Sequence, residues 1–239
     1  MTTPAKEEPL YLGHRERLRQ RFMVDEGASM PDYELLELLL TMAIPRRDVK
    51  PLAKKLINTF GDIGEVLHAP AHKLMDAGVS PNAIILIRLV ATCGMRSAYD
   101  GFRDSNEPIF SNWIQFEEYC REKMAYKEVE EFRVFFLDGS YRLTGEKLIT
   151  TGTINKSSIH PREIIRAAIE NKAVYLILAH NHPSGNSEPS PADVKMTKNF
   201  VELADIMDIE VFDHIVVGRD GTFSFRAAGY IEPKKKKEL

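Results

Sequence analysis

The sequence lacks the features that mark secreted, disulfide-stabilised or membrane proteins. Only two of its 239 residues are cysteines, Cys93 and Cys120, and neither belongs to a CxxC pair. They cannot build a disulfide framework or a cysteine-rich zinc site, and they suit a reducing compartment. The first residues form no apolar signal segment, and no apolar run approaches the roughly 18 residues of a membrane span. We therefore expect a cytoplasmic protein that contacts no membrane.

The sequence also lacks a strong excess of either charge. The formal net charge is -3, and residues 1–100 carry 13 Lys and Arg against 13 Asp and Glu. This balance disfavours a protein that coats nucleic acid, because such proteins use a basic excess to neutralise phosphates. A composition of 44% hydrophobic and 28% charged residues is ordinary for a globular chain. The length allows one large domain or two small ones.

The first hundred residues show helical patterns. The expected helices run through residues 34–40, 52–60, 66–75 and 81–93. We expect Asp32 to cap the first of them and Pro45 to end it, while Gly61 closes the second. The stretch 97–111 combines Asp, Gly, Ser, Asn and Pro, and therefore predicts a linker.

Beyond this stretch, helical and extended patterns alternate. The expected helices are 113–124, 161–171 and 193–207, and the expected strands are 132–137, 142–150, 174–179, 209–217 and 222–226. Helices interspersed with strands predict an α/β or α+β fold for this half of the chain.

Two histidines directly follow the apolar strand 174–179. Residues at positions i and i+2 of an extended segment project to the same side, so His180 and His182 can face one ion. The next helix begins near Asp193, which returns a carboxylate to the same place. Two imidazoles and one carboxylate form a three-ligand metal set that leaves a coordination position for water. We therefore predict that His180, His182 and Asp193 bind a metal.

The assignment of Asp193 has an alternative, and a further ligand candidate exists. Ser190 and Asp193 also form a capping box, with Ser at the N-cap, Pro191 at the first helical position and the acid two residues later. Taken alone this pair predicts a cap, and only its coincidence with the two histidines favours the metal. His214 is a possible fourth ligand, although a structural pair between Asp213 and His214 is the better interpretation.

The motifs resemble a known family. The spacing H-x-H-P-x(6)-S-x-x-D is that of the JAB/MPN metallopeptidase fold, and the run from Ala179 to Asp193 resembles the bacterial RadC family. Further similar segments are Gly152–Asn155, His160–Ile164, Asp213–Gly218 and Gly13–Leu18. The resemblance covers nearly the whole chain. It implies an all-helical, helix-hairpin-helix-like domain at 1–100, a linker at 101–110, an α-β-α JAB/MPN (cytidine-deaminase-like) domain at 111–231 and a basic tail at 232–239.

The resemblance implies a zinc-dependent metallopeptidase or isopeptidase that carries one Zn2+ per chain and cleaves an amide bond in a peptide or protein. In the family a glutamate before an early strand is the general base. Glu130 and Glu131 both stand at that place, and the family spacing to Asp138 favours Glu130. Strand alternation would point the two side chains to opposite faces, so only one can serve. The resemblance also assigns Ser190 to holding the oxyanion.

The alternative function is DNA binding in a repair-associated protein whose metal site is structural or vestigial. Helix-hairpin-helix modules bind phosphates through backbone N–H groups of a Gly-x-Gly hairpin. This chain has Gly78-Val79-Ser80-Pro81 instead, and Pro81 has no N–H to donate. The clear basic cluster is Arg15, Arg17, Arg19 and Arg21. A metal-dependent nuclease is a third interpretation, but no second acidic cluster supports a two-metal site.

Overall fold

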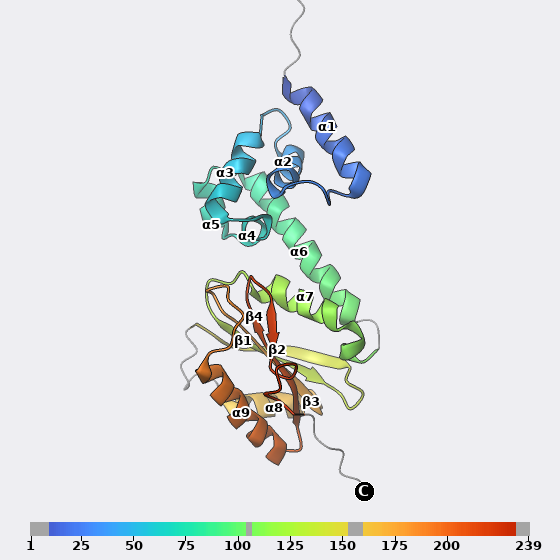
Figure 1. The fold of residues 1–239 in the computed structure, drawn as a ribbon, viewed down its shortest axis with the longest axis vertical. Coiled ribbons are helices and arrows are strands. Elements are labelled where there is room, and N and C mark those ends of the chain that lie inside the picture. The colour runs from blue at the N-terminus through green and yellow to red at the C-terminus, as the bar shows by residue number, and fades with distance from the viewer. Residues whose placement is uncertain (1–9, 104–106, 153–159, 233–239) are drawn as a thin grey trace, which may run out of the picture. The chain divides into compact units, whose positions relative to one another are not determined.

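The computed structural model describes residues 10–103, 107–152 and 160–232. The chain divides into two compact units, Met1–Cys93 and Gly94–Leu239. The first unit is helical (Figure 1). Its helices are α1 (Leu10–Asp25), α2 (Asp32–Ala43), α3 (Lys50–Phe60), α4 (Ile63–His68), α5 (Ala71–Asp76) and the start of α6 (Pro81–Arg103).

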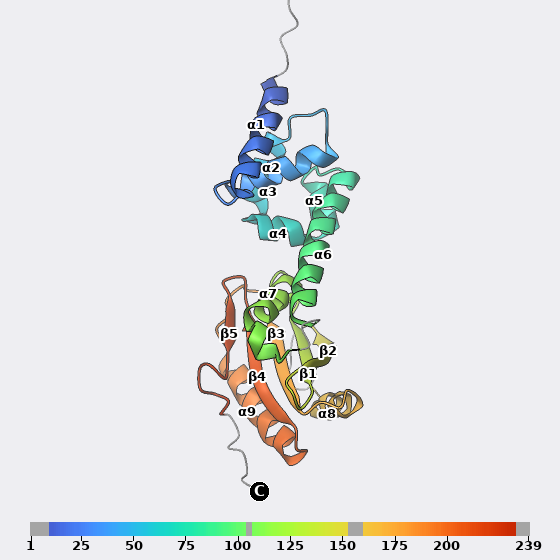
Figure 2. The same ribbon diagram turned by 90° about the vertical axis from the view of Figure 1, so that its right-hand side faces the viewer.

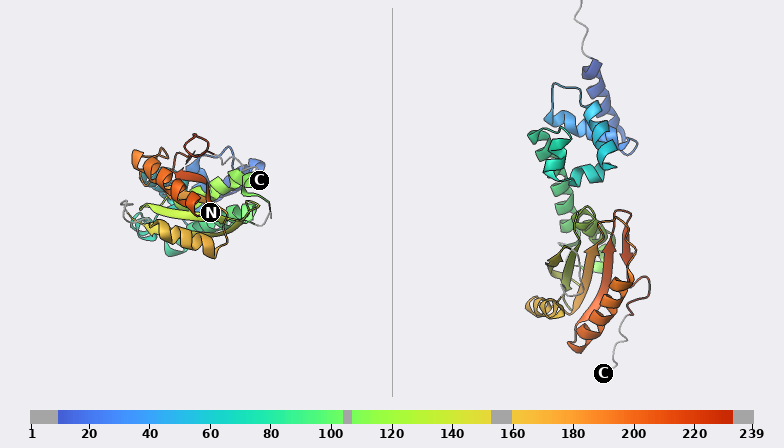
Figure 3. Two further views of the ribbon diagram at one scale, coloured as in Figure 1. Left: turned by 90° about the horizontal axis from the view of Figure 1, so that it is seen from below. Right: turned by 90° about the vertical axis from the view of Figure 1, so that its left-hand side faces the viewer.

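The first unit has its own apolar core. Leu36 and Leu40 of α2, Leu56 of α3 and Ile87 of α6 are fully buried in one cluster. Figure 3 shows the shorter helices gathered around the first half of α6. These leucines and isoleucines recur at helical spacing, so each helix buries a single apolar stripe against its neighbours.

Two helical expectations for this unit are wrong in detail. Pro31, not Asp32, is the N-cap residue of α2, and the Asp32 carboxylate instead accepts a hydrogen bond from the backbone N–H of Ile63, where α4 begins. The single helix expected over 66–75 is two helices, α4 and α5, because Pro70 separates them. Proline disfavours helical geometry in the residue before it, and Ala69 has extended backbone angles.

The linker expected from residue 97 is also wrong at its start, because α6 continues to Arg103. The side chains of Met95, Ala98 and Tyr99 pack against the core of the second unit, and the ring of Tyr99 lies 5.1 Å from that of Tyr119. This tertiary packing overrides the turn-like composition of the segment.

The second unit contains a five-stranded mixed sheet. Its elements are the 3-10 helix η1 (Ile109–Asn112), α7 (Trp113–Met124), β1 (Glu131–Leu137), β2 (Leu143–Thr151), α8 (Pro161–Glu170), β3 (Tyr175–Asn181), α9 (Pro191–Ile206), β4 (Glu210–Val217) and β5 (Thr222–Ser224). The strand order is β2-β1-β3-β4-β5 (Figure 2). Among the described strands, only the pair β3 and β4 is parallel, with α9 as the crossover. The α+β expectation is confirmed.

Helices cover both faces of the sheet. On one face, α7 packs Phe116 and Cys120 against Phe135 of β1. On the other, α8 and α9 pack against the alternate strand residues, among them Phe132 and Leu178. The inner strands β1 and β3 are buried on both faces, which is why they read as almost continuous apolar runs.

Some expected features lie outside the described residues. These are residues 153–155 of the Gly152–Asn155 segment and all of the basic tail after Glu232. In the part of the chain that the structure describes, no helix combines the length and the apolar character needed to cross a bilayer.

We predict that Phe135→Ala lowers the free energy of unfolding of the second unit by about 3–5 kcal/mol, because a fully buried ring would leave a cavity. Phe135 also meets Phe116 edge to face, with ring centroids 4.9 Å apart. The measurement is urea unfolding followed by the fluorescence of Trp113, the one tryptophan. Phe135→Leu, which keeps most of the volume, is the control and should lose less. An unchanged midpoint for Phe135→Ala would contradict the packing described.

Candidate metal centre

The predicted ligands lie where β3 ends and α9 begins. His180 and His182 project from one side of the end of β3, toward the first turn of α9, which holds Asp193. Gly185 turns the chain between them with φ +92°, and a Cβ atom there would lie 2.8 Å from the guanidinium of Arg219. Arg219 in turn donates hydrogen bonds to the carbonyls of Pro183 and Ser184. Arg219 therefore stabilises the turn, and the positive φ and close contact at position 185 require glycine there.

The structure brings the predicted ligand atoms together. Nε2 of His180 and Nε2 of His182 are 3.1 Å apart. Oδ2 of Asp193 lies 3.7 Å from the first and 3.4 Å from the second. One donor atom from each of these residues and from Glu130 all lie within 4.8 Å of one another. Residues from three separate segments thus converge on one point.

These separations fit a small divalent cation. Zinc binds nitrogen and oxygen ligands at about 2.0–2.2 Å, so two ligand atoms of a tetrahedral site lie about 3.3 Å apart. The distances of 3.1, 3.4 and 3.7 Å span this value. Two imidazole nitrogens that face one another at such a distance need a proton or a cation between them. Imidazole and carboxylate together are ligands that zinc accepts.

Asp193 is at once a helix cap and a predicted ligand. The capping box is present, and Oδ2 of Asp193 accepts hydrogen bonds from the backbone N–H of Ser190 at 2.7 Å and from its hydroxyl at 2.6 Å. The same oxygen faces both histidines. The oxyanion role expected for Ser190 stays a prediction, and it requires this hydroxyl to leave Asp193.

The two candidate bases differ in their surroundings. Glu130 belongs to the four-residue group around the histidines. The Glu131 carboxylate instead accepts hydrogen bonds from Arg133 at 2.9 and 3.0 Å and forms an ion pair with Lys127. Glu130 therefore lies with the predicted ligands, whereas Glu131 is engaged away from them. The choice of Glu130 as the base stays a prediction.

Asn181, the middle residue of H-x-H, holds the segment that carries Glu130. Its side chain is fully buried. Its amide oxygen accepts from the backbone N–H of Glu131 at 2.7 Å, and its amide nitrogen donates to the carbonyl of Val129 at 3.2 Å. Asn181 therefore forms hydrogen bonds with the backbone on both sides of Glu130. Sequence reasoning missed this role, because the partners lie about fifty positions away along the chain.

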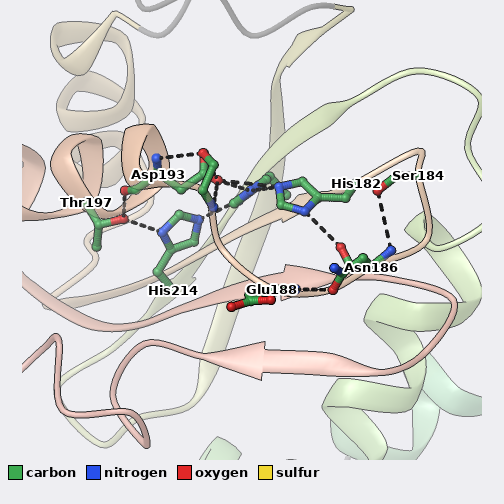
Figure 4. Close-up of polar contacts among 9 residues, drawn as sticks. His182, Ser184, Asn186, Glu188, Asp193, Thr197 and His214 are labelled. Carbon is green, nitrogen blue, oxygen red and sulfur yellow. Dashed lines mark hydrogen bonds and ion pairs between the residues drawn. The ribbon is translucent and has the colours of Figure 1, made fainter.

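Each histidine has a partner for its second ring nitrogen. Nδ1 of His182 lies 2.9 Å from the carbonyl oxygen of Asn186, and Nδ1 of His180 lies 2.8 Å from Nε2 of His214. Figure 4 shows His214 between the proposed ligands and Thr197. His214 is a neighbour of the predicted ligand His180 and lies outside the four-residue group.

The side-chain pair expected between Asp213 and His214 does not form. Adjacent strand residues point to opposite faces, and the Asp213 carboxylate bonds the Ser224 hydroxyl and the backbone N–H groups of Arg226 and His214. Burial raises the pKa of Asp213, against these hydrogen bonds.

The electrostatics of the group match its geometry. Burial opposes ionisation of Asp193, but hydrogen bonds from His180 and His182 outweigh it and hold the pKa of the carboxyl well below its ordinary value. The hydrogen bond to Asp193 raises the pKa of His182, while partial burial works against it. Burial lowers the pKa of His214 well below its ordinary value, with the charge of His180 acting in the same direction. His214 is therefore a neutral imidazole at neutral pH.

The chain is similar to proteins of a known family. A family model described as "RadC-like JAB domain" matches residues 110–230. The chain is 40% identical over 225 residues to UPF0758 protein SPO0054 of Ruegeria pomeroyi, and the match covers 93% of this chain and 100% of that protein.

We predict that His182 of chelator-treated protein titrates above its ordinary pKa, because the Asp193 carboxylate stabilises the imidazolium. The raised pKa means that protonated His182 stabilises the metal-free fold at low pH, and that this stabilisation is lost as the pH rises through the raised value. Zinc needs the neutral ring, so zinc affinity should fall as the pH drops below the same value.

Histidine NMR signals followed through a pH titration give the His182 pKa, and Asp193→Asn is the control. Removing the carboxylate charge should bring the pKa of His182 down. A value at or below the ordinary one in the unaltered protein, or no change in the variant, would show that the two side chains are not coupled.

Proposed function

This chain belongs to the RadC-like JAB-domain family, and from that premise we propose that it is a zinc-dependent hydrolase that cleaves an amide bond in a peptide or protein substrate. The observation that carries the proposal is the convergence of Glu130, His180, His182 and Asp193 on one point. Two imidazoles and a carboxylate leave a fourth coordination position, as in catalytic zinc sites. Both cysteines are free thiols, which supports placing this activity in the reducing cytoplasm.

In the proposed reaction His180, His182 and Asp193 would hold one zinc ion per chain. A zinc ion in such a site lowers the pKa of water and polarises a carbonyl group. Glu130 takes a proton from the attacking water and delivers a proton to the nitrogen of the leaving amine, so that water and an amide become an acid and an amine. Asn181 restrains the backbone on both sides of Glu130, which limits how far the base can move.

The DNA-binding alternative has less support. Arg15 donates hydrogen bonds to the carbonyls of the loop after α2. Arg19 pairs with Glu16, and Arg21 pairs with Glu34. Three of the four clustered arginines therefore have partners within the protein. Phosphate binding would have to replace these contacts, so we do not propose DNA as the substrate or partner.

We predict about one zinc per chain after zinc loading and removal of excess metal, measured by elemental analysis. His180→Ala and Asp193→Ala should lose the zinc, because each removes a ligand. Asp193→Ala also removes part of a helix cap, so Ser190→Ala is the matched control: it weakens the cap, keeps every ligand, and should retain the zinc. Full zinc content in His180→Ala would refute the ligand assignment.

We predict that Glu130→Gln retains zinc and loses about 10²–10⁴-fold in turnover, the usual contribution of a general base. Glu131→Gln is the matched control and should keep both zinc and turnover, because Glu131 bonds Arg133 and not the ligands. The measurement is cleavage of a peptide library, screened with and without chelator. Normal turnover by the Glu130→Gln protein would exclude Glu130 as the base.

We further predict that duplex DNA binds weakly and that Arg17→Ala with Arg21→Ala leaves this affinity unchanged. Fluorescence anisotropy of a labelled duplex at low and moderate salt measures it. Tight, salt-dependent binding that the double variant weakens would restore the DNA-binding alternative.

A further inference from the structure

A buried chain of hydrogen bonds runs from the proposed ligand His180 back to Asp193. Nδ1 of His180 lies 2.8 Å from Nε2 of His214, and Nδ1 of His214 lies 2.6 Å from the hydroxyl of Thr197. The Thr197 hydroxyl lies 2.7 Å from the backbone carbonyl of Asp193. His180, Thr197 and His214 are at most 1% exposed, so bulk water offers these groups no other partners. Figure 4 shows the hydrogen bonds that join Asp193, Thr197 and His214.

The chemistry of the groups determines which atom donates and which accepts in each of these hydrogen bonds. A carbonyl oxygen only accepts, so the Thr197 hydroxyl donates its single proton to Asp193. Thr197 must then accept from His214, whose proton therefore sits on Nδ1. A neutral imidazole that carries its proton on Nδ1 has a lone pair on Nε2. That lone pair accepts from Nδ1–H of His180, and Nε2 of His180 is left without a proton.

We propose that Thr197 and His214 are positioning residues that set the tautomer of His180 and so keep its Nε2 available to a metal ion. This inference rests on the proposed zinc site. Without the anchor at Thr197, His214 could carry its proton on Nε2. It would then accept no hydrogen bond there, and His180 would be free to carry its proton on Nε2, where it would block the ion.

The two proposed imidazole ligands differ in the partner that fixes the proton on Nδ1. Nδ1 of His182 faces the carbonyl of Asn186 directly, and a carbonyl alone is enough to fix a tautomer. Nδ1 of His180 points into the protein toward β4, where it meets a side chain that is itself able to donate or to accept. Whether Nε2 of His214 donates or accepts therefore depends on a further group, the hydroxyl of Thr197.

The test compares Thr197→Val with Thr197→Ser. Valine keeps the shape and loses the hydroxyl, whereas serine keeps the hydroxyl. We expect the zinc dissociation constant, measured by competition with a chromophoric chelator, to rise about 10–100-fold in Thr197→Val and to stay near the original in Thr197→Ser. Thr41→Val is a matched control in the other unit, since it removes a buried hydroxyl that bonds a backbone carbonyl. Its zinc affinity should not change.

The second readout does not need zinc. Long-range proton–nitrogen NMR of chelator-treated protein distinguishes the two tautomers of each imidazole. We expect His180 and His214 to carry their protons on Nδ1 in the unaltered and Thr197→Ser proteins, and His180 to shift toward the Nε2 form in Thr197→Val. If Thr197→Val does not fold, His214→Gln and His214→Leu replace it. The glutamine side chain offers His180 an oxygen acceptor, so the His214→Gln protein should bind zinc more tightly than the His214→Leu protein.

Three results would overturn the proposal. One is an unchanged His180 tautomer and zinc affinity in Thr197→Val. Another is an equal loss in Thr197→Ser, which would point to packing instead of the hydroxyl. The last is equal zinc binding by His214→Gln and His214→Leu. If the unaltered protein binds no zinc, the proposed hydrolase function fails. The tautomers of His180 and His214 in the metal-free protein still show whether Thr197 and His214 set the tautomer of His180.

Discussion

An imidazole binds a metal only through the ring nitrogen that carries no proton, and the rest of the site depends on that constraint. His180 and His182 face each other through Nε2 at 3.1 Å, so both must carry any proton of the neutral ring on Nδ1 when an ion binds. The fold supplies an acceptor for each Nδ1, one from a backbone carbonyl and one through His214 and Thr197. These contacts are as much a part of the site as its ligands.

The position of β3 in the sheet explains how one short segment gathers so many groups. Its antiparallel neighbour β1 begins directly after Glu130, and its parallel neighbour β4 carries His214. The crossover helix α9 brings back Asp193 and Thr197. Because side chains alternate along a strand, the two histidines can face the proposed metal position while Asn181 bonds the start of β1. The middle residue of H-x-H therefore restrains the segment that carries Glu130, the proposed base.

Much of the second unit could be predicted from its sequence, because β1, β3 and α9 show strong local patterns and the proposed ligands follow a short motif. Some of the errors have tertiary causes. Residues 97–103 have the composition of a linker, but Tyr99 and its neighbours pack on the core of the second unit. The roles of His214 and Asn181 depend on contacts with residues 34 and 50 positions away, respectively. Strand register decides such contacts, and no local pattern reports it.

Asp193 shows why a local rule and a functional prediction need not compete. The capping box and the metal motif make different demands on the same carboxylate, and Oδ2 meets both of them. Hydrogen bonds from Ser190 orient this oxygen before any ion arrives, and the first turn of α9 fixes the backbone behind it. A side chain that is already ordered loses little conformational freedom on binding, so in the proposed site Asp193 should bind a metal more tightly than a freely rotating carboxylate would. The helix cap is thus a means of preorganising the site.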